Sequence, residues 1–249
     1  MFDLSTMGWA LVGVSAALVG LSKTGIPGLG ILMAPLMAMA FPGHTRESTG
    51  ILLGMLILGD LFAAGYYRRR AEWGHVVRLL PAAFLGIVAG WRAMDYVTDD
   101  QLQPIMGAIV LVLLGLNYWR TRAGGPNAPT PGQWWFGALM GFAAGFTTMM
   151  ANAAGPVMVI YLLAMRLPKI EFIGTSAWFF FVINWLKVPF SVTLGLISWE
   201  SLKLNLMMLP LIAGGAVGGI LFVHRIPQKA FNAVVEILTI AAAIKLLFY

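Results

Sequence analysis

The sequence predicts an all-α, polytopic membrane protein made of two inverted repeats, and three observations lead to this prediction. First, 59% of the 249 residues are hydrophobic and only 10% are charged, whereas about 25% of the residues in a soluble domain are charged. Second, apolar stretches long enough to cross a bilayer recur along the whole chain. Third, a polar, Gly- and Pro-containing interruption divides the apolar sequence in each half of the chain.

About eight to ten transmembrane helices are expected from the apolar segments. Two of these segments, 25–41 and 153–166, are short for a span of about 20 residues. Each is expected either to cross as a short or broken helix or to form a re-entrant hairpin. The ten segments lie at about 6–22, 25–41, 48–67, 75–94, 101–119, 132–150, 153–166, 172–195, 203–223 and 229–248.

The two halves of the chain resemble each other. The polar, Gly- and Pro-rich stretch 124–131 reads as a linker between a first repeat, 1–123, and a second repeat, 132–249. Residues of the same kind recur in the same order at a spacing of about 128 residues, which predicts an internal duplication of about five membrane segments per repeat. Matching positions include Gly13 with Gly141, Ala16 with Ala144, and Gly86-x-x-x-Gly90 with Gly214-x-x-x-Gly218.

The distribution of basic residues favours ten crossings over eight. If all ten segments cross, most Lys and Arg residues lie on one side of the membrane, whereas re-entrant short segments would divide them almost evenly. The positive-inside rule therefore predicts ten crossings with both termini outside the cytoplasm. An odd number of crossings per half also makes the second repeat run opposite to the first, as in many secondary transporters.

The first interruption lies between Gly20 and Gly30 and predicts the start of a helix. Thr24 is a typical N-cap residue, and Pro27 is a residue favoured in the first turn. A helix is therefore expected from Pro27 to Phe41. Its free N–H groups around Gly25, together with the charge of Lys23, would attract an anion.

The second interruption, between Gly145 and Pro156, predicts a matching helix start. Asn152 occupies the position that corresponds to Thr24 and is expected to cap a helix that begins near Gly155. Two helix starts from opposite repeats would then enclose an anion-binding cavity. In the alternative interpretation, both interruptions are ordinary loops at the membrane surface, and Lys23 is a cytoplasmic anchor.

Ionisable residues within the apolar segments are the other candidates for function. Asp60 and Lys187 are about 127 residues apart, at nearly equivalent places in the two halves, and such charges normally face the protein interior and have a partner. We expect the two to approach each other, either as a structural pair or as a relay in which Asp60 exchanges a proton. Asn184 lies one turn from Lys187 and could share its face. Glu236, in the last segment, is a second candidate for proton coupling.

Catalysis has little support in the sequence. The chain has no Cys, which excludes disulfides and thiol chemistry, and its three His residues are far apart. No Ser-His-Asp arrangement, P-loop or metal-ligand spacing occurs. We therefore expect no enzyme, no cofactor and no metal. The net charge of +6 is attributed to cytoplasmic loops and not to a nucleic-acid partner.

The motif Gly13-x6-Gly20-Leu-Ser-Lys-Thr-Gly-Ile-Pro-Gly-Leu-Gly-x4-Pro35, followed by Asn152-x2-Gly155-Pro156, resembles that of the TauE/SafE sulfite exporter family, also called the toluene-sulfonate uptake permeases. The resemblance covers essentially the whole chain. It implies a multi-pass protein of the bacterial inner membrane, with both termini then periplasmic. It also implies secondary transport of a small anion such as sulfite or an organosulfonate, with protons as a candidate coupling ion.

The sequence therefore predicts a transporter that works by alternating access, with a small anion and the lipid bilayer as its partners. A passive anion channel and a membrane-embedded subunit of an enzyme or transport assembly are the alternatives. The direction of transport and the formation of a homo-oligomer are left open. The residues expected to bind the substrate are Lys23, Thr24, Gly25, Pro27, Asn152, Gly155, Asn184 and Lys187.

Overall fold

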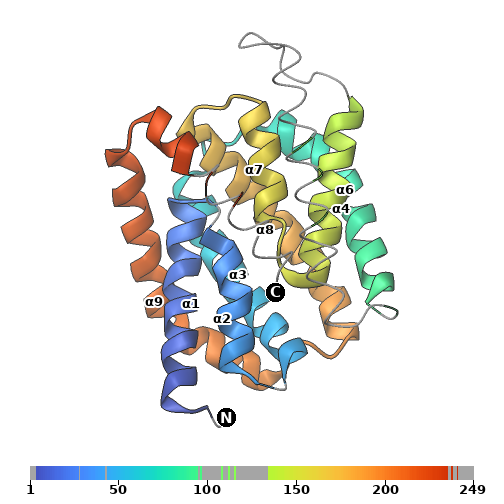
Figure 1. The fold of residues 1–249 in the computed structure, drawn as a ribbon, viewed down its shortest axis with the longest axis vertical. Helices are drawn as coiled ribbons and strands as arrows, with labels where there is room; N and C mark the ends of the chain where they lie inside the picture. The colour runs from blue at the N-terminus through green and yellow to red at the C-terminus, as the bar shows by residue number, and fades with distance from the viewer. Residues whose placement is uncertain are drawn as a thin grey trace.

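The structure is a computed structural model that describes residues 4–27, 29–42, 44–94, 96, 108, 112, 115, 134–234, 237 and 240. All regular secondary structure in these residues is helical, which confirms the predicted all-α class (Figure 1). The helices are α1 (Thr6–Thr24), η1 (Leu29–Leu32), α2 (Met33–Ala40), α3 (Thr45–Tyr66), α4 (Trp73–Ala93), α6 (Trp134–Ala151), α7 (Gly155–Ala164), α8 (Lys169–Thr193) and α9 (Trp199–Arg225).

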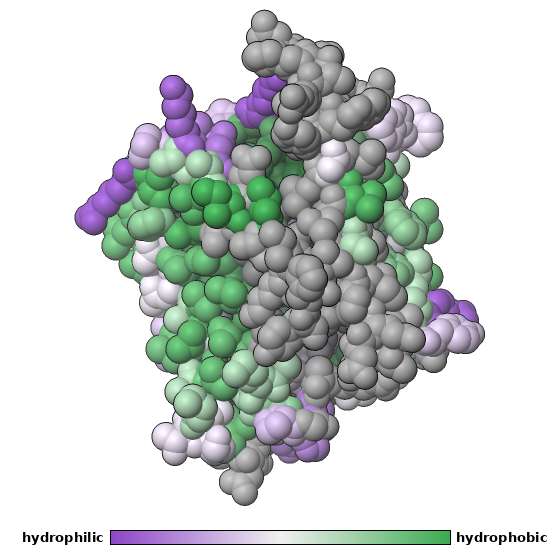
Figure 2. All heavy atoms as spheres, viewed as in Figure 1, coloured by the Kyte–Doolittle hydropathy of each residue, from purple (hydrophilic) through white to green (hydrophobic). Residues whose placement is uncertain are grey.

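Four helices in the described part of the chain are long and apolar enough to cross a membrane. They are α1, α4, α9 and the part of α3 from Glu47 to Tyr66. Among the coloured residues of Figure 2, hydrophobic ones cover the middle height at the left and right of the view, and hydrophilic ones gather towards the two ends of the molecule. This arrangement is that of a polytopic membrane protein, in which an apolar belt faces lipid and polar groups face water.

The two short segments form short helices. The segment 25–41 contains the 3-10 helix η1 and the 8-residue helix α2, and 153–166 contains the 10-residue helix α7. At 1.5 Å per residue, α2 and α7 measure roughly 12 and 15 Å, about half of the ~30 Å hydrocarbon core. Neither helix alone is long enough to span the membrane.

The helix predicted from Pro27 to Phe41 is present from Leu29 to Ala40, where the 3-10 helix η1 leads directly into α2. Helix α1 continues as far as Thr24, and the N–H of Gly25 closes it with a hydrogen bond of 2.9 Å to the carbonyl of Leu21. Regular structure begins again only at Leu29, with the 3-10 turn. In the second half the expectation holds better, because α7 begins at Gly155 with Pro156 in its first turn.

Each half of the chain packs its first helix against the last described helix of the other half. Helix α1 lies along α9, and α4 lies along α6, while α3 contacts α8 between them. In Figure 1, α1 and α9 run from the lower to the upper end, whereas α4 and α6 run from the upper to the lower end. The two halves are therefore interlocked, and α1 and α6, the first described helices of each half, run in opposite directions, as do α4 and α9.

Glycines allow these interlocking helices to approach closely. A Cβ atom at Gly20 of α1 would lie 2.0 Å from the carbonyl oxygen of Ile212 in α9, and one at Gly145 of α6 would lie 1.9 Å from the carbonyl oxygen of Ala83 in α4. Small residues at such positions permit backbone contact between membrane helices, where dispersion forces replace the hydrophobic effect as the source of stability.

The apolar core consists of two clusters. One includes Met33, Leu52 and Ile212, from α2, α3 and α9. The other includes Val159 and Ile173, from α7 and α8. The space between the two clusters is where the interrupted segments meet, so this space is the place to look for a site.

A side chain at Gly145 is expected to destabilise the protein by forcing α4 and α6 apart. Overpacking of this kind costs about 1–3 kcal/mol. We expect Gly145→Leu to lower the melting temperature of the detergent-purified protein. Gly65→Leu is the matched control, because a Cβ at Gly65 meets nothing within 4 Å. Equal melting temperatures for the two variants would contradict the close α4–α6 contact.

Candidate functional site

A cavity of about 50 Å³ lies between the break after α1 and the break after α6. One water molecule needs roughly 10–15 Å³ of such a cavity, so the space holds a few water molecules or one small ion. Both halves of the chain line it, and the α7 N-terminus contributes Gly155 and Pro156. The polar lining residues are Ser22, Lys23, Thr148, Asn152, Ser176 and Asn184.

Lys23, in the last turn of α1, is held by α3 and α8. Its Nζ lies 2.7 Å from Oδ1 of Asp60, and the two side chains are 10% and 0% exposed. The same ammonium lies 4.1 Å from the ring centroid of Phe180 in α8, which is a cation–π contact. Lys23 is therefore a buried group of the site and not a surface anchor.

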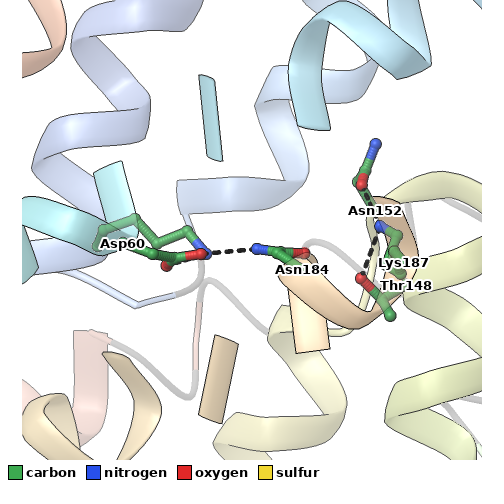
Figure 3. Close-up of polar contacts among 6 residues, drawn as sticks. Asp60, Thr148, Asn152, Asn184 and Lys187 are labelled. Atoms are coloured by element: carbon green, nitrogen blue, oxygen red, sulfur yellow. Dashed lines mark hydrogen bonds and ion pairs between the residues drawn. The ribbon is translucent and has the colours of Figure 1, made fainter. Parts of the chain in front are cut away.

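Asn184 joins this ion pair to the second half of the chain. Its Nδ2 donates a hydrogen bond of 2.7 Å to Oδ2 of Asp60 (Figure 3). Both carboxylate oxygens of Asp60 thus have a partner, one from α1 and one from α8. Asn184 is 1% exposed, and its own oxygen, Oδ1, has no hydrogen-bond partner among the described residues.

Lys187 lies one turn further along α8 and contacts the second break. Its Nζ donates hydrogen bonds of 2.6 Å to Oδ1 of Asn152 and 3.2 Å to Oγ1 of Thr148 (Figure 3). Asn152 in turn donates from Nδ2 to the carbonyl oxygen of Thr49 in α3, at 3.2 Å. The backbone of Asn152 has a φ of 55°, in the left-handed region that Asn tolerates better than most residues.

The charges of this cluster do not cancel. Lys23 and Asp60 neutralise each other, whereas the 2%-exposed Lys187 has only the neutral partners Thr148 and Asn152 among the described residues. With all three groups ionised, the cluster carries one net positive charge. A charge inside a membrane protein is costly without a counter-ion, so the site favours an anion.

The direct pair expected between Asp60 and Lys187 does not form. Because α1 remains helical up to Thr24, it carries Lys23 to the middle of α3, and Lys23 becomes the ion-pair partner of Asp60. The link between Asp60 and the region of Lys187 is indirect and passes through Asn184.

The expected N-caps are also wrong. The Thr24 hydroxyl donates to the carbonyl oxygens of Ala216 in α9 and Gly20, at 2.7 and 3.0 Å, and so ties two helices together. The N-cap of α7 is Ala154, while Asn152 binds Lys187. The helix starts at the cavity are therefore those of α7, at Gly155, and of the 3-10 helix η1, whose Gly30 lines the wall. At the first break, the cavity meets the C-terminal end of α1, whose negative dipole the Lys23 charge offsets.

The structure brings five of the eight expected binding residues to the cavity wall, namely Lys23, Pro27, Asn152, Gly155 and Asn184. Lys187 lies behind the wall and reaches it through Thr148 and Asn152. Thr24 faces α9, and Gly25 packs against Gly219, where a Cβ would lie 2.5 Å from the Gly219 carbonyl oxygen. Glu236 lies outside the described residues.

The lining residues that were not expected include Thr148 and Phe180. A signal for Phe180 exists in the sequence, because Ser176, Phe180 and Asn184 are spaced by four residues and so lie on one face of α8. Thr148 carries no such signal, since a hydroxyl residue in a membrane helix more often bonds its own backbone or mediates packing.

A bundle of apolar helices with a polar cavity between two interruptions of its helices is typical of a membrane transport protein. A family model described as sulfite exporter TauE/SafE matches residues 7–246. The chain therefore belongs to this family, as the sequence motifs predicted, and is a multi-pass membrane protein of a transporter family. No curated protein and no solved structure matches the chain significantly.

Removing only one partner of the Lys23–Asp60 ion pair is expected to destabilise the protein more than removing both. Asp60→Ala leaves a buried, unpaired Lys23, which typically costs about 3–5 kcal/mol, and should lower the melting temperature strongly. The double variant Lys23→Met/Asp60→Leu should recover most of the loss, because neither charge is then left unpaired.

The control for this experiment is Lys187→Met/Asp60→Leu. This variant keeps Lys23 without a partner and should therefore stay as unstable as Asp60→Leu alone. Recovery in this control, together with no recovery in Lys23→Met/Asp60→Leu, would mean that Lys187 is the functional partner of Asp60.

Proposed function

We propose that this protein is a secondary transporter that carries a small anion, such as sulfite or an organosulfonate, across the bacterial inner membrane. The observation that carries the proposal is the buried Lys187 ammonium, which has only neutral partners beside a small central cavity. An anion in the cavity would supply the missing counter-charge.

The binding groups come from both breaks. Lys23 and Asn184 would contact the anion from one side of the cavity, and Asn152 and the α7 N-terminus at Gly155 from the other. The N–H groups at the start of α7 point their positive dipole at this space. Lys187 would act through its field and through Asn152, whose amide it orients.

Alternating access would follow from movement of one half against the other. The opposite directions of corresponding helices, and the reciprocal packing of α1 on α9 and of α4 on α6, support an inverted repeat. In such transporters the site lies where the repeats meet, at discontinuous helices. The cavity between the two breaks fits that position.

A cluster of basic residues at one end of the molecule supports an orientation in the membrane. Contacts between the C-terminal ends of α3 and α9 and the start of α8 place Arg70, Arg225 and Lys169 close together. By the positive-inside rule this end is cytoplasmic. Since α1 begins at the opposite end, the N-terminus would be periplasmic, and ten crossings would place the C-terminus there too.

Anion binding is expected to raise the melting temperature of the purified protein. Ligand that binds only the folded state stabilises it by RT ln(1 + [L]/Kd), or about 2.7 kcal/mol at 100 times Kd. Sulfite, sulfate, methanesulfonate and acetate are the test anions, with chloride at equal ionic strength as the reference. Lys187→Met should abolish the shift, whereas Lys203→Met, near the far end in α9, should retain it. A response to cations alone would contradict the proposal.

A carrier and a channel are distinguished by counterflow. Proteoliposomes loaded with unlabelled sulfite should accumulate labelled sulfite transiently, and uptake should saturate. A carrier shows both effects because each cycle requires binding and a conformational change. Flux that rises linearly with concentration, with an ionic current and no counterflow, would instead identify a passive anion channel.

A further inference from the structure

We propose that Asn184 couples protonation of Asp60 to binding of the anion, so that one proton enters the site with each monovalent anion. This inference rests on the proposed function and adds the coupling device to it. It uses the ion pair, the orphan oxygen of Asn184 and the position of the cavity.

The orientation of the Asn184 amide is dictated by the ionised carboxylate. A carboxylate only accepts hydrogen bonds, so Nδ2 must face Asp60, at 2.7 Å from Oδ2. The oxygen Oδ1 then points away from Asp60, towards the side where Asn152 and Lys187 lie (Figure 3). It is buried there and has no hydrogen-bond partner in the part of the chain that the structure describes. An unsatisfied buried acceptor is costly, and it repels the oxygens of an anion in the cavity that Asn184 lines.

Protonation of Asp60 reverses this arrangement. The carboxylic acid has one O–H donor, which can donate to Asn184 Oδ1 once the amide turns over about its last torsion, whose two orientations are similar in energy. The Nδ2 group then points towards the side of Asn152 and Lys187, as a donor at the wall of the cavity that Asn184 lines. The Lys23 ammonium also loses its counter-ion, and it already lines the cavity. The site gains two donors for an anion, and the orphan acceptor disappears.

The charge of the cluster supports the same coupling. Among the described residues, the charged groups that face Asp60 are Lys23 on α1 and, further away on α8, Lys187. With Asp60 ionised the three groups sum to +1, and with Asp60 protonated and a monovalent anion bound the sum is again +1. The net charge of the site is therefore the same with and without the bound anion, so loading adds no net charge to the low-dielectric interior. An anion alone would instead compete with Asp60 for Lys23.

The test measures methanesulfonate binding to the full-length, detergent-purified protein between pH 5.5 and 8.5, because methanesulfonate keeps its charge over this range. For a binding event linked to one proton, Kd should rise up to about tenfold per pH unit on the alkaline side. In weak buffer with a pH-indicator dye, the wild-type protein should take up close to one proton per bound anion at alkaline pH.

Single variants test which residues couple the proton to the anion. Asp60→Asn should bind methanesulfonate with the same Kd at every pH, because its amide can donate to Asn184 Oδ1 permanently. Asn184→Leu should flatten the pH profile as well as weaken binding, whereas a merely structural role would weaken binding and leave the slope unchanged. Glu200→Gln is the control, since Glu200 is an exposed carboxylate at the start of α9 and should give the wild-type profile.

The outcomes separate this inference from the proposed function. Binding that is independent of pH in the wild-type protein, without proton uptake, would overturn the coupling and leave anion transport intact. An unchanged slope in Asn184→Leu would remove Asn184 from the mechanism. Absence of binding of methanesulfonate and sulfite at every pH would overturn both. If Asp60→Asn does not fold, the proton count on the wild-type protein decides.

Discussion

The contact between the Lys23 ammonium and the Asp60 carboxylate is the constraint on which the rest of the site depends. It fixes the end of α1 against the middle of α3, at 2.7 Å and almost out of reach of solvent. A buried charge is tolerated only when its partner is held in place, so the backbone must keep these two elements in register. The break that follows α1, the cavity beside it and the orientation of Asn184 all follow from that fixed point.

The class of fold and both interruptions could be predicted from the sequence, because they depend on composition and on local residue types. Whether the first interruption begins or ends a helix could not be predicted. Gly25 and Pro27 after Thr24 fit the start of a helix, but Gly just after a helix and Pro soon after it equally mark an end. The end of α1 is instead set by its packing against Gly219 and Ala216 of α9. No local sequence pattern predicts this tertiary contact.

The ion-pair partners of the charged residues also could not be predicted from local sequence. Asp60 and Lys187 were recognisable as functional candidates because ionisable residues are rare within membrane segments. Which charge meets which depends on how far α1 extends, and one turn of helix decides whether Lys23 reaches Asp60. The face of α8 formed by Ser176, Phe180 and Asn184 was readable from its spacing, but apolar membrane helices have many such faces. Only the neighbouring breaks distinguish the one that lines the cavity.

The reciprocal packing of the halves has a consequence for biogenesis. Helix α1 leaves the ribosome early, yet the carbonyl that accepts the Thr24 hydroxyl belongs to Ala216, 192 residues later. Until α9 is inserted, the face of α1 at Gly20 lacks the helix backbone that it packs against in the folded protein. The seam between α1 and α9 therefore cannot close until α9 has been synthesised, so the first half of the chain reaches its final packing only after most of the second half has been made.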